Sequence, residues 1–296
     1  MRRLTGVPDR EARDRARRVA TPDSYASPGH YHSPIPSLAD IDEAERNAAA
    51  TGPLPGVDLA EVGQLRLLEE LARHYASMPF TEEDSPRFRY RFDNPSYSYA
   101  DGIFLYAMLR HLRPKRVIEV GSGYTSALML DTSEHFLGDS VEICFIEPHP
   151  DLLLGLMTDA DRHKSRVIQS RLQDVDLAIF DTLEAGDILF VDSTHVSKFN
   201  SDVNRLFFEI LPRLAPGTIV HLHDIFPGFE YPMDWLRQGR AWNEQYILRA
   251  FLEFNASFKV RLFGSHMIQR EPEWFRAHMP LCLKNPGGAF WMERVA

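Results

Sequence analysis

The chain has 296 residues, 44% of them hydrophobic and 25% charged, which is ordinary globular composition and enough for one large α/β domain with an appended segment. Its formal net charge of −9 argues against a surface that tracks nucleic-acid phosphates. No run approaches the roughly 20 apolar residues of a membrane span, and two cysteines do not make a disulfide framework. We therefore expect a cytoplasmic protein whose partners include neither nucleic acid nor a membrane.

The first 85 residues are interpreted as an N-terminal arm followed by a cap or lid segment. Residues 1–20 are rich in arginine interrupted by acids, which predicts a polar helix rather than a signal peptide or a lipid anchor. Residues 21–57 are rich in Pro, Ser, Gly and Ala, with room for a short helix over 38–50. The aromatic and imidazole side chains of residues 30–36 fit either a lid across a pocket or plain surface packing.

From residue 86 onward, strands and helices alternate as in a single α/β domain. Strands are predicted over residues 117–120, 141–147, 166–169, 188–192, 218–223, 258–263 and 288–293. Helices are predicted over residues 59–75, 101–112 with Asp101 as N-cap, 127–131, 150–159, 175–183, 201–214 and 244–254. Continuous apolar strands between helices indicate a parallel sheet covered on both faces. An irregular stretch with Trp274, Phe275 and Pro280 separates the last two strands, which suits an antiparallel pair at the sheet edge.

A glycine-containing turn directly follows the first of these strands. It reads Glu119-Val-Gly-Ser-Gly-Tyr-Thr-Ser126. Gly121 and Gly123 permit a tight turn and a close approach of the backbone to a ligand, and the next helix presents free N–H groups. The third glycine of a dinucleotide fingerprint is replaced by Ser126, which disfavours a nicotinamide-dependent oxidoreductase.

Four motifs together resemble the class I S-adenosylmethionine (SAM)-dependent methyltransferases. They are residues 117–126 (VIEVGSGYTS), 145–148 (FIEP), 188–195 (ILFVDSTH) and 211–224 (LPRLAPGTIVHLHD). The last two look like the branch of macrocin-type and cephalosporin-biosynthesis O-methyltransferases. The resemblance spans about residues 94–295. It implies a Rossmann-like α/β sheet of seven strands with the last pair antiparallel, a SAM-binding domain over 86–296, and SAM as the cofactor.

Position and resemblance together indicate the cofactor-binding residues. Glu147 ends the second strand, where a carboxylate can accept both ribose hydroxyl hydrogens, although an acid that caps the next helix is the alternative. The resemblance implies that Glu119 holds the methionine part of SAM and that Gln173 and Asp174 contact adenine. Residues at the start of the next helix can contact the cofactor carboxylate. Together with the turn and the pocket wall, they complete the set of candidates: Gly121, Ser122, Gly123, Tyr124, Thr125, Ser126, Asp192 and Tyr99. Tyr97 and Tyr99 fit a pocket wall and a plain core equally well.

Chemistry-bearing residues cluster where the fourth and fifth strands end. Asp192 ends one strand, and His223 and Asp224 end the other, so neighbouring strands would bring them to one rim. We interpret these three as ligands of a divalent metal. The resemblance implies Mg²⁺, but His223 in place of an acid shifts the preference toward Mn²⁺ or Fe²⁺. His195, three residues after Asp192, is the candidate catalytic base, with Asp192 beside it. The alternative is that both acids orient substrate or cap loops without an ion.

These features predict a SAM-dependent methyltransferase that methylates an oxygen of a small-molecule acceptor such as a sugar or a secondary metabolite. Phe229, Tyr231 and Trp235 fit an acceptor pocket or a plain core. One alternative is a methyltransferase-like enzyme that uses SAM or the metal for cyclisation or hydroxylation, and another is a non-catalytic partner subunit with the same fold. The acceptor, and whether the chain forms a homo-oligomer, stay open.

Overall fold

The computed structural model describes residues 25–47 and 54–296, so the polar helix predicted over 1–20 lies outside the described residues. The described chain divides into two compact units. Residues 25–47 and Tyr231–Ala241 form the smaller unit, and residues 54–230 and Trp242–Ala296 form the larger one.

The smaller unit contains two helices that contact each other. They are α2 (Leu38–Asn47) and α9 (Met233–Arg237). The Arg237 guanidinium lies 3.1 Å from the Asp42 carboxylate and also pairs with Glu45, which ties the two helices together. The short helix predicted over 38–50 is therefore present, as far as the chain is described. The proposed lid role of residues 30–36 stays a prediction.

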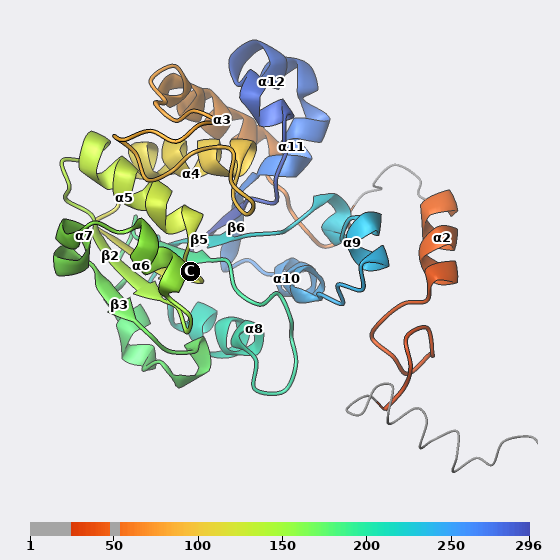
Figure 1. Ribbon diagram of the computed structural model, residues 1–296. Helices are drawn as coiled ribbons and strands as arrows, with labels where there is room; N and C mark the ends of the chain where they lie inside the picture. Colours follow the sequence, from red (N-terminus) through yellow and green to blue (C-terminus); the bar gives the residue numbers. More distant parts are fainter. Residues whose placement is uncertain (1–24, 48–53) are drawn as a thin grey trace, which may run out of the picture. The chain divides into compact units, whose positions relative to one another are not determined.

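The larger unit contains a seven-stranded sheet in the order β3-β2-β1-β4-β5-β7-β6 (Figure 1). Its strands are β1 (Arg116–Val120), β2 (Glu142–Ile146), β3 (Arg166–Ile168), β4 (Ile188–Val191), β5 (Ile219–Leu222), β6 (Phe258–Phe263) and β7 (Phe290–Arg294). The first five run parallel, and β7 is antiparallel to both of its neighbours, β5 and β6. This arrangement confirms the predicted fold class, including the antiparallel last pair.

Helices cover both faces of this sheet, as the continuous apolar strands predicted. They are α3 (Glu61–Tyr75), α4 (Tyr99–Leu112), α5 (Tyr124–Phe136), α6 (Asp151–Leu156), α7 (Asp159–Lys164), α8 (Asp202–Arg205), α10 (Glu244–Leu252), α11 (Gly264–Arg270) and α12 (Pro272–His278). The predicted domain boundary after residue 85 stays a prediction. Helix α3, which that boundary assigns to the cap, packs on α4 and β6, and the Phe263 N–H donates to Gln64 Oε1 across 2.6 Å.

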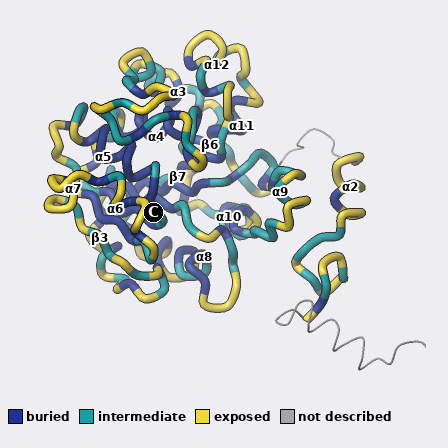
Figure 2. The backbone as a smooth tube through the Cα atoms, viewed as in Figure 1, coloured by how far each residue is buried: buried dark blue, intermediate teal, exposed yellow. Residues whose placement is uncertain are grey.

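Two hydrophobic cores lie on opposite faces of the sheet, because successive side chains of a strand point to opposite sides. On β4, Ile188 and Phe190 join the core shared with α3, α4, α5, α11 and α12, whereas Leu189 and Val191 join the core shared with α8 and α10. The strands in the middle of the sheet are accordingly mostly dark blue in the burial view, whereas the edge strand β3 is less buried (Figure 2). Each fully buried side chain of this kind contributes about 1.5–3 kcal/mol. The two cores fix the strand ends, and the strand ends carry the candidate site.

Several predicted helices differ in detail from the observed ones. The helix predicted over 201–214 is α8 continued by a π-helical turn and a 3₁₀ turn, and Pro212 in the last turn lacks the N–H that an α-helix would use. Residues 177–182 form a 3₁₀ helix. The stretch between β6 and β7, predicted to be irregular, instead forms α11 and α12. The prediction was wrong because both helices are short, seven residues each, so neither displays a full hydrophobic period.

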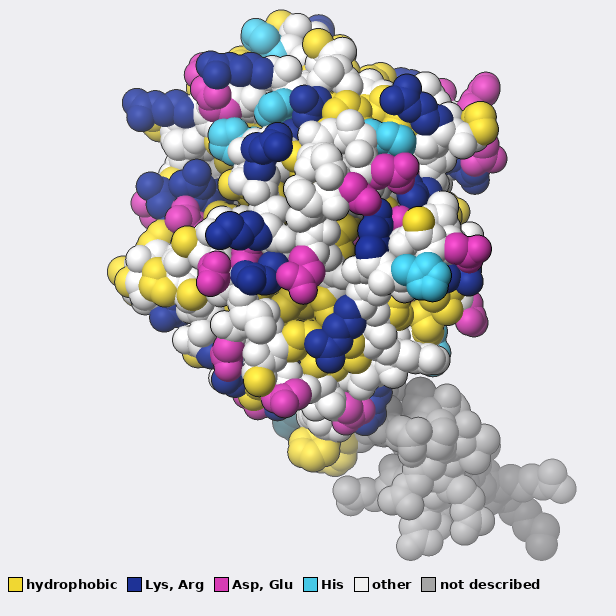
Figure 3. Space-filling view, turned by 90° about the vertical axis from the view of Figure 1, so that its left-hand side faces the viewer, with side chains coloured by type: hydrophobic (Ala, Val, Ile, Leu, Met, Phe, Trp, Pro, Cys, Tyr) yellow, Lys and Arg dark blue, Asp and Glu magenta, His cyan; other side chains and the backbone are white. Residues whose placement is uncertain are grey.

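The predicted partners stay a prediction. Acidic and basic side chains are interspersed over the face seen in Figure 3. Over the described ranges, no helix combines the length and the apolar character needed to cross a bilayer.

Candidate active site

The glycine turn after β1 requires glycine at its first position. Gly121 has φ +82°, and a Cβ placed there would lie 1.8 Å from the carbonyl oxygen of Asp192. The loop after β1 therefore touches the loop after β4 through bare backbone, which no other residue type allows. Helix α5 begins directly after this turn, at Tyr124.

A cavity of about 370 Å³ opens at the carboxyl ends of β1, β2 and β4. It is lined by Val120, Gly121, Ile146, Glu147, Pro148, His149, Arg171, Leu172, Gln173, Asp192, Ser193, Thr194 and Asp202. The Glu147 carboxylate accepts the N–H of Ser122 at 3.0 Å and that of His149 at 2.8 Å, one on each oxygen. Because a carboxylate oxygen accepts two hydrogen bonds, each still has room for a hydroxyl of a bound ribose.

Glu119 lies at the end of β1 and is fully buried. Its Oε2 accepts the hydroxyl of Ser126, which in turn accepts the Gly123 N–H at 3.0 Å. Its Oε1 has no hydrogen-bond partner among the described residues. Burial raises the pKa of Glu119 to about 8, although nearby hydroxyls counteract that effect. An unpartnered buried carboxylate oxygen fits the ammonium group of a methionine moiety.

The other predicted cofactor residues are distributed unevenly around the cavity. Gln173 lines it and donates to the Asn200 carbonyl at 2.9 Å. Asp174 pairs with Arg171 on the surface and is absent from the lining. Tyr99 donates its hydroxyl to Glu82 at 2.8 Å, and it too is absent from the lining. Sequence reasoning did not single out Leu172, Thr194 or Asp202, which do line the cavity. Leu172 and Thr194 lie in the short segments after β3 and β4, for which the sequence shows no period, whereas Asp202 begins helix α8.

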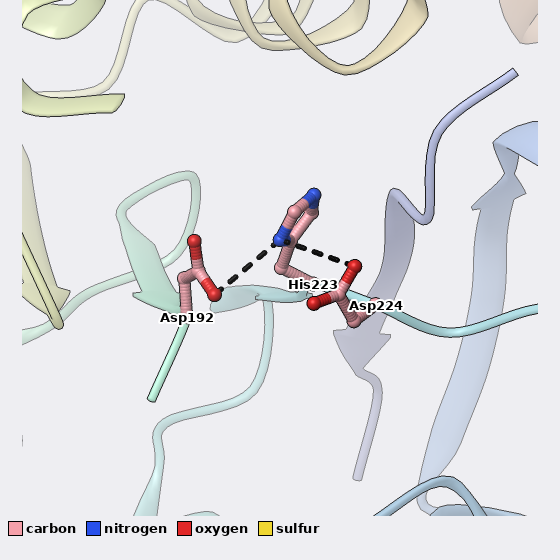
Figure 4. Close-up of side chains that lie close together, drawn as sticks. All are labelled: Asp192, His223 and Asp224. Atoms are coloured by element: carbon pink, nitrogen blue, oxygen red, sulfur yellow. Dashed lines mark ion pairs between the residues drawn. The ribbon is translucent and has the colours of Figure 1, made fainter. Parts of the chain in front are cut away.

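The three predicted metal ligands converge at the rim between β4 and β5 (Figure 4). One ligand atom from each of Asp192, His223 and Asp224 lies within 4.8 Å of the others. The Nδ1 atom of His223 is 3.3 Å from Asp192 Oδ1 and 3.8 Å from Asp224 Oδ1. Neither ring nitrogen of His223 has a hydrogen bond of good geometry to another described residue. Two carboxylates around an imidazole nitrogen that lacks a hydrogen bond fit a divalent cation.

Electrostatic coupling at this rim is strong. Burial opposes ionisation of Asp192, His223 and Asp224. Even so, His223 holds the pKa of Asp192 well below its usual range. The neighbouring carboxylates hold the pKa of His223 well above the usual value for histidine. Burial raises the pKa of Asp224. A negative site of this kind attracts a cation, whether a proton or a metal ion.

His195 also faces this rim. Its Nε2 lies 3.4 Å from Asp192 Oδ1 and 3.5 Å from Asp224 Oδ2, and its Nδ1 lies 2.8 Å from Glu244 Oε2. Although burial alone would lower it, the contacts with Asp192 and Glu244 raise the pKa of His195 to about 10. His195 and Asp224 both have positive φ, +58° and +56°. Backbone strain in non-glycine residues is often found at functional sites.

Two acids at the rim have roles that sequence reasoning did not find. Asp101 was predicted to cap a helix, but α4 already begins at Tyr99, and the Asp101 carboxylate is buried, where it accepts the Gly288 N–H at 2.9 Å. Glu244 does lie in the first turn of α10, as predicted, but its carboxylate is turned toward His195. The sequence offers no signal for either contact, because each joins segments far apart in the chain.

Sequence comparisons identify a known domain in the middle of the chain. A family model described as a methyltransferase domain matches residues 118–225, from β1 to just after β5. An uncharacterized protein of Archaeoglobus fulgidus is 32% identical over 168 residues, which cover 54% of this chain and 75% of the relative. The chain therefore contains a methyltransferase domain over residues 118–225.

Solved methyltransferase structures share low sequence identity with this methyltransferase. The SAH-bound methyltransferase PaMTH1 of Podospora anserina is 15% identical, with a TM-score of 0.39 over 88% of this chain and 93% of that one. The O-methyltransferase TomG of Streptomyces achromogenes, in complex with SAM, is 15% identical, with a TM-score of 0.43 over 84% of this chain and 100% of that one.

Proposed function

We propose that this methyltransferase transfers the methyl group of SAM to an oxygen of a small acceptor, a sugar or a secondary metabolite, at the rim between β4 and β5. The observation that carries the proposal is the position of Asp192. It lines the cavity beside Gly121 and Glu147, and it also belongs to the rim cluster with His223 and Asp224. A cofactor in the cavity and an acceptor at the rim would therefore meet at one residue.

Two acids have roles that follow from their free hydrogen-bonding capacity, Glu147 in the cavity lining and Glu119 at the end of β1, outside that lining. Glu147 would accept the two ribose hydroxyls, and Glu119 would hold the ammonium end through Oε1. When bound, SAM supplies an electrophilic methyl group on a sulfonium. The protein's contribution is to align an acceptor oxygen with that methyl group and to exclude water.

The rim residues would manage the proton of the acceptor hydroxyl. Nε2 of His195 is the proposed proton acceptor once an ion engages Asp192, because Glu244 binds the opposite ring nitrogen and the Trp242 ring lies 4.5 Å from the imidazole between centroids. Asp192, His223 and Asp224 would hold a divalent ion, whose chemistry would be to lower the pKa of a bound hydroxyl. One imidazole with two carboxylates suits Mn²⁺ or Fe²⁺ better than Mg²⁺.

Calorimetry with S-adenosylhomocysteine (SAH) tests the cofactor assignment. Glu147→Ala removes two hydrogen bonds to ribose and is expected to weaken SAH binding at least about tenfold, roughly 1.4 kcal/mol. Asp174→Ala, an exposed carboxylate outside the cavity lining, is the control. Equal affinities for Glu147→Ala and the native protein would reject the ribose role, and no SAH binding by the native protein would reject the function.

The acceptor is found by screening candidate sugars and secondary metabolites and weighing the products. A gain of one methyl group supports the proposal, and His195→Ala is then expected to lower turnover by about 10²–10⁴-fold. A different mass change would favour the second candidate, a SAM- or metal-dependent cyclisation or hydroxylation. The observation that keeps this candidate is His223, an imidazole where the resembling enzymes have an acid.

A further inference from the structure

Each histidine of the rim lies between an inner and an outer carboxylate. The inner carboxylate is Asp192 for both rings. Its Oδ1 atom lies 3.4 Å from Nε2 of His195 and 3.3 Å from Nδ1 of His223. The outer carboxylates differ. Glu244 Oε2 is 2.8 Å from Nδ1 of His195, and Asp101 Oδ2 is 3.3 Å from Nε2 of His223. The two rings therefore approach Asp192 with opposite nitrogens.

Asp101 is held in place by backbone that only glycine permits. Its carboxylate is 3% exposed, and one oxygen accepts the Gly288 N–H at 2.9 Å. Gly287 has φ +65°, and a Cβ there would lie 2.1 Å from Asp101 Oδ2. A Cβ on Gly288 would lie 2.6 Å from the Asp224 Cα. The glycine pair thus brings the Asp101 carboxylate and the Asp224 backbone close together, with His223 beside both.

Glu244 is held equally firmly, by the start of helix α10. Glu244 is 1% exposed. The backbone N–H groups of Asn243 and Glu244 both donate to the His195 carbonyl, at 3.0 and 3.1 Å. The same helix turn therefore fixes both the backbone and the ring of His195. Burying a carboxylate is costly unless it is paired, and the imidazole is the partner that each of these acids faces.

We propose that Asp101 and Glu244 are positioning residues that fix opposite tautomers of the two histidines, with the proton on Nε2 of His223 and on Nδ1 of His195. Glu244 accepts the Nδ1 hydrogen of His195, and the charge of Asp101, 3.3 Å from Nε2 of His223, favours a proton on that nearer nitrogen. When an ion bound to Asp192 and Asp224 leaves both rings neutral, the lone pairs of His223 Nδ1 and His195 Nε2 would then both lie on the side of these two carboxylates. This inference rests on the proposed function, because it assigns one lone pair to a divalent ion and the other to the acceptor proton.

Histidine ¹⁵N NMR on the Zn²⁺-loaded full chain tests the tautomers directly. Zn²⁺ is diamagnetic, and His223→Gln and His195→Gln identify the signals. We expect the His223 ring to keep a proton on Nε2 while Nδ1 takes a metal-bound shift. We expect His195 to show a hydrogen-bonded proton on Nδ1, whether or not Nε2 is protonated. A proton on Nδ1 of His223, or a bare Nδ1 in His195, would overturn the assignment.

Metal titration of variants gives a second, independent measurement. Asp101→Asn is expected to weaken Mn²⁺ binding, followed by electron paramagnetic resonance, by about 10–100-fold. Glu244→Gln should leave Mn²⁺ affinity within about threefold, because Glu244 acts on the other histidine, but it should shift the His195 Nδ1 proton upfield. The control is Glu61→Gln, which alters a carboxylate–histidine pair of the same 2.8 Å length, Glu61 with His266, away from the rim.

The outcomes separate this inference from the proposed function. If wild-type protein fails to bind Mn²⁺ or Zn²⁺, or if a folded Asp101→Asn binds them as the native protein does, the inference is wrong. If Asp101→Asn does not fold, the NMR signals of the unmodified chain still decide. If the metal and NMR results hold but SAH does not bind, the positioning role stands and the methyltransferase assignment of the cavity falls.

Discussion

Glu119 is a buried acid, and its burial disfavours the ionised form. Burial raises its pKa to about 8, so below that pH the carboxyl group is largely protonated. An ammonium ligand favours the carboxylate, and binding would then release a proton. We expect SAH affinity to rise as pH increases from 6 to 8, by at most about tenfold per pH unit, and to level off above the pKa.

Calorimetry of SAH binding at several pH values, in buffers of different ionisation enthalpy, measures this proton release. Glu119→Gln should bind more weakly and remove the pH dependence, because the amide cannot ionise. A pH dependence that survives in Glu119→Gln would assign the proton to another group.

The backbone position of Gly121 requires glycine for two separate reasons, a positive φ and the lack of space for a Cβ atom. Gly121→Ala would place a methyl group 1.8 Å from the Asp192 carbonyl oxygen, a contact that backbone movement must relieve. We expect the free energy of unfolding, measured in urea, to fall by at least about 2 kcal/mol.

The matched control is Gly186→Ala. Gly186 has φ +87° but nothing within 4 Å of its Cβ position, so only the conformational cost of about 1–2 kcal/mol applies. If the two variants lose equal stability, close contact between the loops after β1 and β4 contributes nothing.

At the scale of elements, Arg89 joins the loop before α4 to helices α5 and α7. Its guanidinium lies 2.7 Å from Asp131 and 2.8 Å from Asp161, two carboxylates whose side chains are fully buried. Removing one partner of a buried ion pair leaves an uncompensated charge. Arg89→Met should therefore lower the free energy of unfolding by about 3–5 kcal/mol.

Arg91→Met tests whether this loss is specific. Arg91 pairs with Asp84 on the surface, and such pairs contribute at most about 1 kcal/mol. Urea denaturation of both variants provides the comparison, and equal losses would show that Arg89 acts only as a surface charge.

At the scale of the whole molecule, ligand binding and folding are coupled. A ligand that binds only the folded chain stabilises it by about 2.7 kcal/mol at a concentration 100 times its Kd. For a chain of this size, SAH at that concentration should raise the melting temperature by roughly 5 °C. Scanning calorimetry measures the shift, and Glu147→Ala should abolish most of it at the same SAH concentration. An equal shift in both proteins would place SAH outside the proposed cavity.

Much of the fold could be predicted because strand patterns are local. Apolar runs between helices indicate a parallel sheet with strand ends at one edge, and Gly121 lies at that edge, where the cavity opens. The convergence of Asp192 with His223 follows from this topology alone, since β4 and β5 are neighbours. The same reasoning failed between β6 and β7, where two short helices show no full period.

The sequence by itself determined which chemical groups follow each strand: a glycine turn after β1, an acid after β2, and acids with histidines after β4 and β5. Only the tertiary structure decided that Glu244 meets His195 and that Asp101 meets His223, and that Tyr99 turns away from the cavity to Glu82. The physical reason is that a strand places its terminal side chains by a two-residue period, whereas contacts between distant segments depend on how separate helices pack.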